Sequence, residues 1–132
     1  MDFKLELVIM PVADIDRAKA FYADKAGFVV DVDFSTGPEF RVVQLTPPGS
    51  DCSISLVSQT GMAPGAIQGL HLVVSDIEAA RAELVGRGIE ASEIFHYAEG
   101  GQVPGLDPTR QKYGSYVSFS DPDGNGWLLQ EA

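Results

Sequence analysis

The sequence predicts an α+β domain made of two tandem βαβββ modules, with eight strands forming a concave cup and two helices outside it. Residues 12–22 (VADIDRAKAFY) recur in altered form as residues 74–84 (VSDIEAARAEL). An apolar, strand-like stretch precedes each copy, and a glycine followed by β-rich runs comes after each. The same order of elements, found twice, indicates a duplicated module.

The first module covers about residues 1–62. LELVIMPV predicts its first strand, and Asp14 is a candidate N-cap for the helix that follows. Ala18, Phe21 and Tyr22 recur at helical spacing and predict the buried stripe of that helix. Three further strands are predicted from the runs FVVDVDF, FRVVQLT and SISLVS, with PPGSD as a turn.

The second module covers about residues 66–132 and repeats this order. GLHLVV predicts its first strand, and Asp76 is the candidate cap of its helix. The following strands are predicted from IEASEIF, YVSFS and WLLQ. Asp121 and Asp123 lie in the turn DPDGNG, where we expect their side chains to bind nearby backbone N–H groups.

Composition limits the class of protein and its partners. A chain of 132 residues with 45% hydrophobic residues suits one domain, residues 1–132. We expect a cytoplasmic protein, because no apolar run approaches the length of about 20 residues that spans a bilayer and the N-terminus is unlike a secretory signal. The net charge of −10 argues against nucleic acid or an anionic membrane as a partner. The single Cys52 allows neither an internal disulfide nor a thiolate metal site.

The chain resembles the vicinal oxygen chelate superfamily, which includes glyoxalase I, bleomycin-resistance proteins and extradiol dioxygenases. Three segments carry the resemblance: VADIDRAKAFYADKAGF, GLHLVVSDIEAARAELVGRGI and SDPDGNGWLLQE. It implies paired βαβββ modules that form a cup, usually in a homodimer. It does not imply one activity, because this fold hosts many chemistries.

In the metal-using members, the resemblance implies one ligand from the first and last strand of each module. The matching positions in this sequence are Leu7, Ser55, Gly69 and Leu128. Leucine and glycine side chains have no lone pair to donate, and a serine is a poor ligand beside them. We therefore expect no metal at this site and no cofactor.

Strand alternation predicts which polar side chains face the cup. His71 lies two residues after Gly69, and Gln130 lies two residues after Leu128, so each should share the face of its neighbour. The same argument and the matching of the modules predict four more ligand-binding residues: Gln44, Ser55, Tyr116 and Ser118. Glu131 and Trp127 have the opposite parity and should point away from the cup.

Residues 95–114 (FHYAEGGQVPGLDPTRQKYG) are rich in glycine and proline and predict a surface loop or lid. His96, Tyr97, Arg110 and Tyr113 could close over a ligand, and Arg110 could hold a carboxylate in bidentate fashion. The alternative is a surface loop in which Arg110 pairs with Asp107.

The leading functional hypothesis is a metal-independent protein that encloses a neutral or cationic organic molecule in an apolar cup. The first alternative is a cofactor-free isomerase, epimerase or lyase that uses His71 as its base. The second is a metal-dependent lyase or dioxygenase with ligands from displaced positions, such as His71 with Glu131 or His96. A homodimer is expected mainly from the resemblance.

Overall fold

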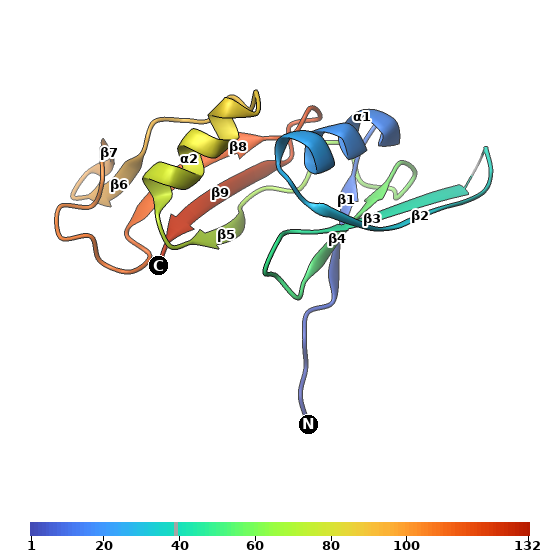
Figure 1. The fold of residues 1–132 in the computed structure, drawn as a ribbon, viewed down its shortest axis with the longest axis horizontal. Coiled ribbons are helices and arrows are strands. Elements are labelled where there is room, and N and C mark those ends of the chain that lie inside the picture. The colour runs from blue at the N-terminus through green and yellow to red at the C-terminus, as the bar shows by residue number, and fades with distance from the viewer. Residues whose placement is uncertain (39) are drawn as a thin grey trace. The chain divides into compact units, whose positions relative to one another are not determined.

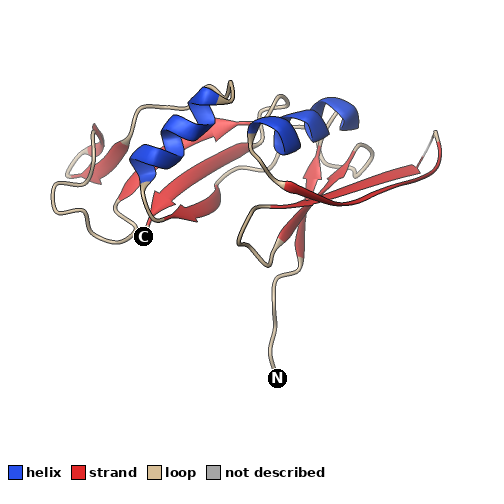
Figure 2. Cartoon of the chain, viewed as in Figure 1, coloured by secondary structure: helices blue, strands red, loops and turns tan. Residues whose placement is uncertain are grey.

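A computed structural model describes residues 1–38 and 40–132 of the chain (Figure 1). The fold is α+β, with a four-stranded and a five-stranded sheet, each associated with one helical segment (Figure 2). The described residues form two compact units: Met1–Ile67 with Asp121–Asn125, and Gln68–Ser120 with Gly126–Ala132. The short segment Asp121–Asn125 thus belongs to the first unit, although the strands on either side of it belong to the second. The repeat in the sequence does not predict that a segment of the second module belongs to the first unit.

The sheet of the first unit has the strand order β1-β4-β3-β2. Its strands are β1 (Leu7–Pro11), β2 (Val29–Gly37), β3 (Phe40–Thr46) and β4 (Ser53–Val57). β1 runs parallel to β4, and the other neighbours are antiparallel. The expected strands are therefore present in this unit, with bounds close to those predicted.

The helical segment of the first unit begins where the sequence predicts. Asp14 caps α1 (Ile15–Ala20) by accepting a 3.0 Å hydrogen bond from the backbone N–H of Arg17. The chain continues into the π-helical turn η1 (Phe21–Lys25). Ala18, Phe21 and Tyr22 are buried, and α1 contacts β4. One face of the sheet is thereby covered.

The sheet of the second unit has the order β5-β9-β8-β6-β7. Its strands are β5 (Leu70–Val74), β6 (Phe95–Ala98), β7 (Gly101–Pro104), β8 (Ser115–Ser120) and β9 (Gly126–Glu131). α2 (Ile77–Gly86) is capped by Asp76, which accepts from the N–H of Ala79 at 3.1 Å. The helix packs against β8 and β9, above the buried side chains of Trp127 and Leu129.

Two predictions for residues 89–104 are wrong. The run IEASEIF forms a strand only from Phe95, because the hydroxyl of Ser92 accepts the N–H of Ser118 in place of a backbone carbonyl. The segment after it is no structureless loop, since β6 and β7 form a hairpin. Gly100 and Gly101 turn it with φ of 91° and 123°, which glycine adopts readily. The described residues therefore form nine strands, one more than expected.

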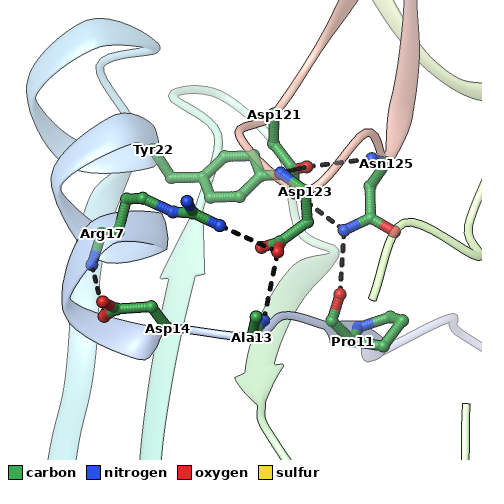
Figure 3. A network of polar contacts seen from close by, with 8 residues as sticks. All are labelled: Pro11, Ala13, Asp14, Arg17, Tyr22, Asp121, Asp123 and Asn125. Atoms are coloured by element: carbon green, nitrogen blue, oxygen red, sulfur yellow. Dashed lines mark hydrogen bonds and ion pairs between the residues drawn. The ribbon is translucent and has the colours of Figure 1, made fainter. Parts of the chain in front are cut away.

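Segment Asp121–Asn125 is held in the first unit by a polar network (Figure 3). Oδ1 of Asp121 accepts the N–H groups of Asp123 and Asn125, both at 2.9 Å, as the turn motif predicts. Its Oδ2 accepts from the hydroxyl of Tyr22 at 2.7 Å. The Asn125 amide donates to the carbonyl of Pro11 at 3.0 Å, and Asp123 pairs with Arg17 at the same distance. The turn is therefore bound both to the end of β1, through Pro11, and to the first turn of α1, through Arg17.

Among residues 1–38 and 40–132, no helix is long and apolar enough to cross a bilayer.

Candidate functional site

The first unit leaves the sheet face opposite α1 exposed to solvent. We call it the first open face, formed by alternate side chains of the four strands: Leu7, Ile9, Val32, Phe34, Phe40, Val42, Gln44, Ser55 and Val57. Its aromatic members are unusually accessible, with Phe34 53% and Phe40 52% exposed. Large apolar side chains in such a cluster mark a surface that binds another molecule.

A cavity of about 460 Å³ lies on this face. Its apolar wall comes from Leu7, Ile9, Phe40, Val42 and Val57, and its polar lining from Arg41, Ser55, Ser58 and Gln59. This volume is in the range of pockets that hold small organic molecules. An apolar wall with few polar groups can bind the body of such a molecule and orient it.

Two residues predicted from the sequence lie on the first open face. Gln44 is directly opposite Ser55 in the antiparallel pair β3–β4, and Ser55 lies beside Ile9 in the parallel pair β1–β4. Ser55 is buried, whereas Gln44 is half-buried. The structure therefore brings these two polar side chains together on one face, among apolar neighbours.

The second unit also has a face that α2 does not cover. This second open face contains two rows of neighbouring side chains across the strands: His71, Leu128 and Ser118, and then Val73, Gln130, Tyr116 and Phe95. Four of the residues predicted from the sequence therefore share this face: His71, Ser118, Tyr116 and Gln130. Glu131 and Trp127 point to the opposite face, as their parity predicts.

Gln130 is oriented by the chain around it. Its Nε2 donates to the carbonyl oxygen of Tyr113 at 3.3 Å and to the hydroxyl of Tyr116 at 3.1 Å. A carbonyl oxygen can only accept, so the amide nitrogen must face Tyr113. Tyr113 thus orients Gln130 through its backbone carbonyl, while the residue as a whole is 54% exposed.

His71 is oriented in a similar way. Its Nδ1 lies 2.7 Å from the carbonyl oxygen of Gly69. Because that oxygen can only accept, Nδ1 carries the hydrogen, and in the neutral ring Nε2 keeps a free lone pair. His71 is exposed on the second open face, so this nitrogen can reach a bound molecule.

An aromatic cluster forms on β6 and β8. The sequence predicts Tyr97 and Tyr116 as candidate ligand contacts, but not that they cluster with Phe95. Phe95 and Tyr116 stack with their ring centroids 5.7 Å apart, and Tyr97 meets Tyr116 edge to face at 5.3 Å. Tyr97 is 59% exposed and offers a ring to a ligand. The signal was the alternation of Phe95 and Tyr97, which the glycine-rich stretch after them obscured.

Two other predicted site residues lie elsewhere. His96 is buried, and its Nδ1 is 2.8 Å from the carbonyl oxygen of Gly105. It alternates with Phe95 and Tyr97 along β6 and so points to the other face of the strand. This hydrogen bond ties the β6–β7 hairpin to the chain that follows it.

The side chain of Arg110 pairs with Glu131 rather than with Asp107. Its Nε and Nη2 lie 3.1 and 2.9 Å from the two carboxylate oxygens of Glu131. This pair, with a further bond from the N–H of Ile77, lowers the pKa of Glu131. A polar cavity of about 330 Å³ beside the pair is lined by Ser75, Asp76, Arg110, Gln111, Lys112, Glu131 and Ala132. Nε and Nη2 of Arg110 are thus already bound to a carboxylate of the protein itself.

The four positions that metal-using members would use as ligands do not fit a divalent ion. Leu7 and Leu128 lie on the two open faces, and Gly69 immediately precedes β5, but none of the three has a side-chain atom that can bind a metal. Ser55 alone offers a hydroxyl. In the described ranges 1–38 and 40–132, no three His, Cys, Asp or Glu side chains converge as a metal site would require.

Comparison with known proteins assigns the family. Residues 4–129 match the model of the Glyoxalase/Bleomycin resistance protein/Dioxygenase superfamily. Among curated proteins, the uncharacterized protein YetH of Bacillus subtilis (strain 168) is 28% identical over 128 residues, which cover 94% of each chain.

Solved structures agree with this assignment. TnmS3, an antibiotic binding protein from Streptomyces sp. CB03234, is 33% identical with a TM-score of 0.78, covering 98% of this chain and 96% of that one. A glyoxalase/bleomycin resistance protein from the same strain is 34% identical with a TM-score of 0.74, covering 96% and 99%. This chain therefore belongs to the glyoxalase/bleomycin resistance protein/dioxygenase superfamily.

Proposed function

We propose that this protein binds a small, neutral or cationic organic molecule on the open faces of its sheets, without a metal ion. The observation that carries the proposal is the cavity of about 460 Å³ on the first open face, walled by Leu7, Ile9 and Phe40. On the second open face, the polar groups of His71, Tyr116 and Gln130 would orient a molecule bound to that face. The similarity to an antibiotic binding protein supports this function.

Charge and donor chemistry set the limits of the proposal. A net charge of −10 favours a cationic or neutral ligand over a polyanion. Leu7, Gly69 and Leu128 offer no metal ligand, so binding would rest on apolar burial and hydrogen bonds. Metal analysis of protein purified without chelators should accordingly find no stoichiometric divalent ion, and one tightly bound ion per chain would contradict this part.

Nile red, a neutral dye that fluoresces in apolar surroundings, tests the site. We expect saturable binding at one defined stoichiometry, with competition by bleomycin as a probe of the family's ligand chemistry. Phe40→Ser removes an aromatic wall of the cavity and should weaken dye binding about tenfold or more. The matched control is Val85→Ser, which removes an exposed apolar side chain from α2. Absent saturation, or equal loss in both variants, would refute the proposal.

We further propose that the protein forms a homodimer. Phe34 and Phe40 on the hairpin β2–β3 leave a large apolar surface in water, and covering it stabilises by about 25 cal/mol for each Å² buried. A second copy of the chain is the commonest partner for such a surface.

The orientation of His71 favours one further candidate function, a cofactor-free isomerase, epimerase or lyase. With Nδ1 donating to Gly69 at 2.7 Å, the lone pair of Nε2 could remove a proton from a carbon next to a carbonyl group. A panel of small ketones and esters in D₂O would show this by proton NMR as deuterium exchange. His71→Ala should abolish the exchange and leave Nile red binding intact, and equal exchange in both proteins would eliminate this candidate.

A further inference from the structure

We infer that the second open face selects ligands that present N–H or O–H donors, such as amides and amines, and that His71 and Gln130 are the acceptors that determine this specificity. The inference rests on the proposed function, because it names the ligand chemistry of one of the two faces proposed to bind a molecule. It is carried by two backbone carbonyl groups that control which atoms these side chains turn outward.

Gln130 presents its amide oxygen. Both hydrogen bonds recorded for its side chain come from Nε2, one to the carbonyl of Tyr113 and one to the hydroxyl of Tyr116. Within the described part of the chain, Oε1 has no protein donor. Rotating the amide by 180° would place Oε1 against the Tyr113 carbonyl, where two acceptors repel. The carbonyl of Tyr113 therefore keeps Oε1 available to a ligand.

The position of the Tyr113 carbonyl is itself well determined. The N–H of Tyr113 donates to the carbonyl of Glu131 at 2.7 Å. Glu131 also holds Arg110 through both of its carboxylate oxygens, at 3.1 and 2.9 Å. Arg110 and Tyr113 adopt φ of 51° and 65°, a region that non-glycine residues rarely occupy. Arg110 is thus a positioning residue that acts on Gln130 through Tyr113.

His71 presents the lone pair of Nε2 for the same reason. Gly69 accepts from Nδ1 at 2.7 Å, so the neutral ring carries its hydrogen there. His71 pairs with Leu128 across β5 and β9, two residues before Gln130 on the same face. Two outward acceptors therefore lie on neighbouring strands, and both need a donor from the ligand.

Tyr116 adds a complementary group. Its oxygen accepts from Gln130, so its own hydroxyl hydrogen is free to donate. Oε1 of Gln130 and the hydroxyl of Tyr116 then form a neighbouring acceptor and donor, which match the N–H and the C=O of an amide. Val73 and Phe95 flank the pair in the same row and provide apolar contact for the rest of the molecule.

A neutral pair of probes tests this without interference from net charge. Benzamide carries two N–H donors, whereas N,N-dimethylbenzamide keeps the ring and the carbonyl but has none. We expect benzamide to shift the side-chain NMR resonances of His71 and Gln130 and to bind at least about fivefold more tightly, the effect of one hydrogen bond. Equal affinities, or no shift from either compound, would overturn the inference.

Variants assign the preference to the proposed acceptors. Gln130→Met removes the amide and should cut the advantage of benzamide to about twofold or less, while Gln111→Met, a matched change on the neighbouring loop, should preserve it. Arg110→Lys removes the bidentate contact to Glu131, and it should reduce the same ratio without abolishing binding. A preference that survives Gln130→Met would assign the selectivity elsewhere and refute the inference.

The tautomer of His71 gives a test that needs no ligand. A long-range ¹H–¹⁵N spectrum of the neutral protein should show the hydrogen on Nδ1, and a dominant Nε2–H form would overturn the inference directly. Failure of these tests with intact Nile red binding would refute the donor selectivity alone. Loss of saturable Nile red binding would refute the proposed function.

Discussion

The hydroxyl of Tyr22 donates a 2.7 Å hydrogen bond to Oδ2 of Asp121, a residue 99 positions further along the chain. Tyr22 is fully buried and Asp121 nearly so, so the bond forms away from water. It links the helical segment of the first unit to the turn between β8 and β9 (Figure 3). The folding of the first unit therefore depends on a segment near the end of the chain.

Tyr22→Phe should lower the free energy of unfolding by about 1–2 kcal/mol, because Asp121 keeps Asn125 as a partner but loses one buried donor. Urea unfolding followed by circular dichroism measures this difference. The control is Tyr97→Phe, which removes an exposed hydroxyl from β6. A loss for Tyr22→Phe no greater than that of the control would contradict the assigned role of the bond.

Gly65→Ala should be more damaging than an ordinary glycine substitution. Gly65 has φ +89°, and a Cβ placed there would collide with the backbone carbonyl oxygen of Asp123. Left-handed backbone costs about 1–2 kcal/mol for other residues, and overpacking adds about 1–3 kcal/mol. Gly49, with φ +83° and open space around its Cβ position, is the matched control. Thermal unfolding should show a clearly larger loss for Gly65→Ala, and equal losses would disprove the close approach.

The Glu131–Arg110 pair predicts a component of acid sensitivity. Because Arg110 and the N–H of Ile77 lower the pKa of Glu131, the unfolded chain takes up this proton at a higher pH than the folded chain. The pair therefore stabilises fully above the unfolded value, 4.5, and its contribution is lost as the pH falls through the lower, folded value.

Glu131→Gln should flatten the fall in unfolding free energy as the pH drops below 4.5 and should lower stability at pH 7. Urea titrations at several pH values provide the measurement. Glu99→Gln, an exposed change in the β6–β7 turn, should leave the slope as in the wild type. An unchanged slope in Glu131→Gln would show that the pair is not the source of the acid sensitivity.

The proposed homodimer predicts a sedimentation mass of about twice 14.1 kDa. Phe34→Ser should shift the equilibrium toward the monomer, because Phe34 is an aromatic side chain exposed by 53% on the first open face. Val85→Ser, on α2, should leave the mass unchanged. Monomeric wild-type protein at about 100 μM, a concentration at which weak dimers with micromolar Kd are populated, would contradict the proposal.

Local sequence chemistry determined most elements of the fold. Asp14 and Asp76 cap the helices that the repeat predicts, because capping depends on residues within one turn. Strand alternation placed His71, Tyr116, Ser118 and Gln130 on one face, since that property has a period of two residues. The family resemblance, which rests on the same segments, is confirmed over residues 4–129.

Other features of the two units were decided only by the tertiary structure. Asp121–Asn125 joins the first unit, Arg110 is bound by Glu131, and β7 extends the second sheet. The first two features depend on contacts between residues distant in the sequence, which no local pattern encodes. β7 instead forms a local hairpin with β6. The outward atoms of His71 and Gln130 follow from the carbonyls of Gly69 and Tyr113, because side-chain polarity is set by the nearest fixed acceptor. The sequence by itself determined which residues share a face of the sheet, and the folded backbone decided which of their atoms point outward.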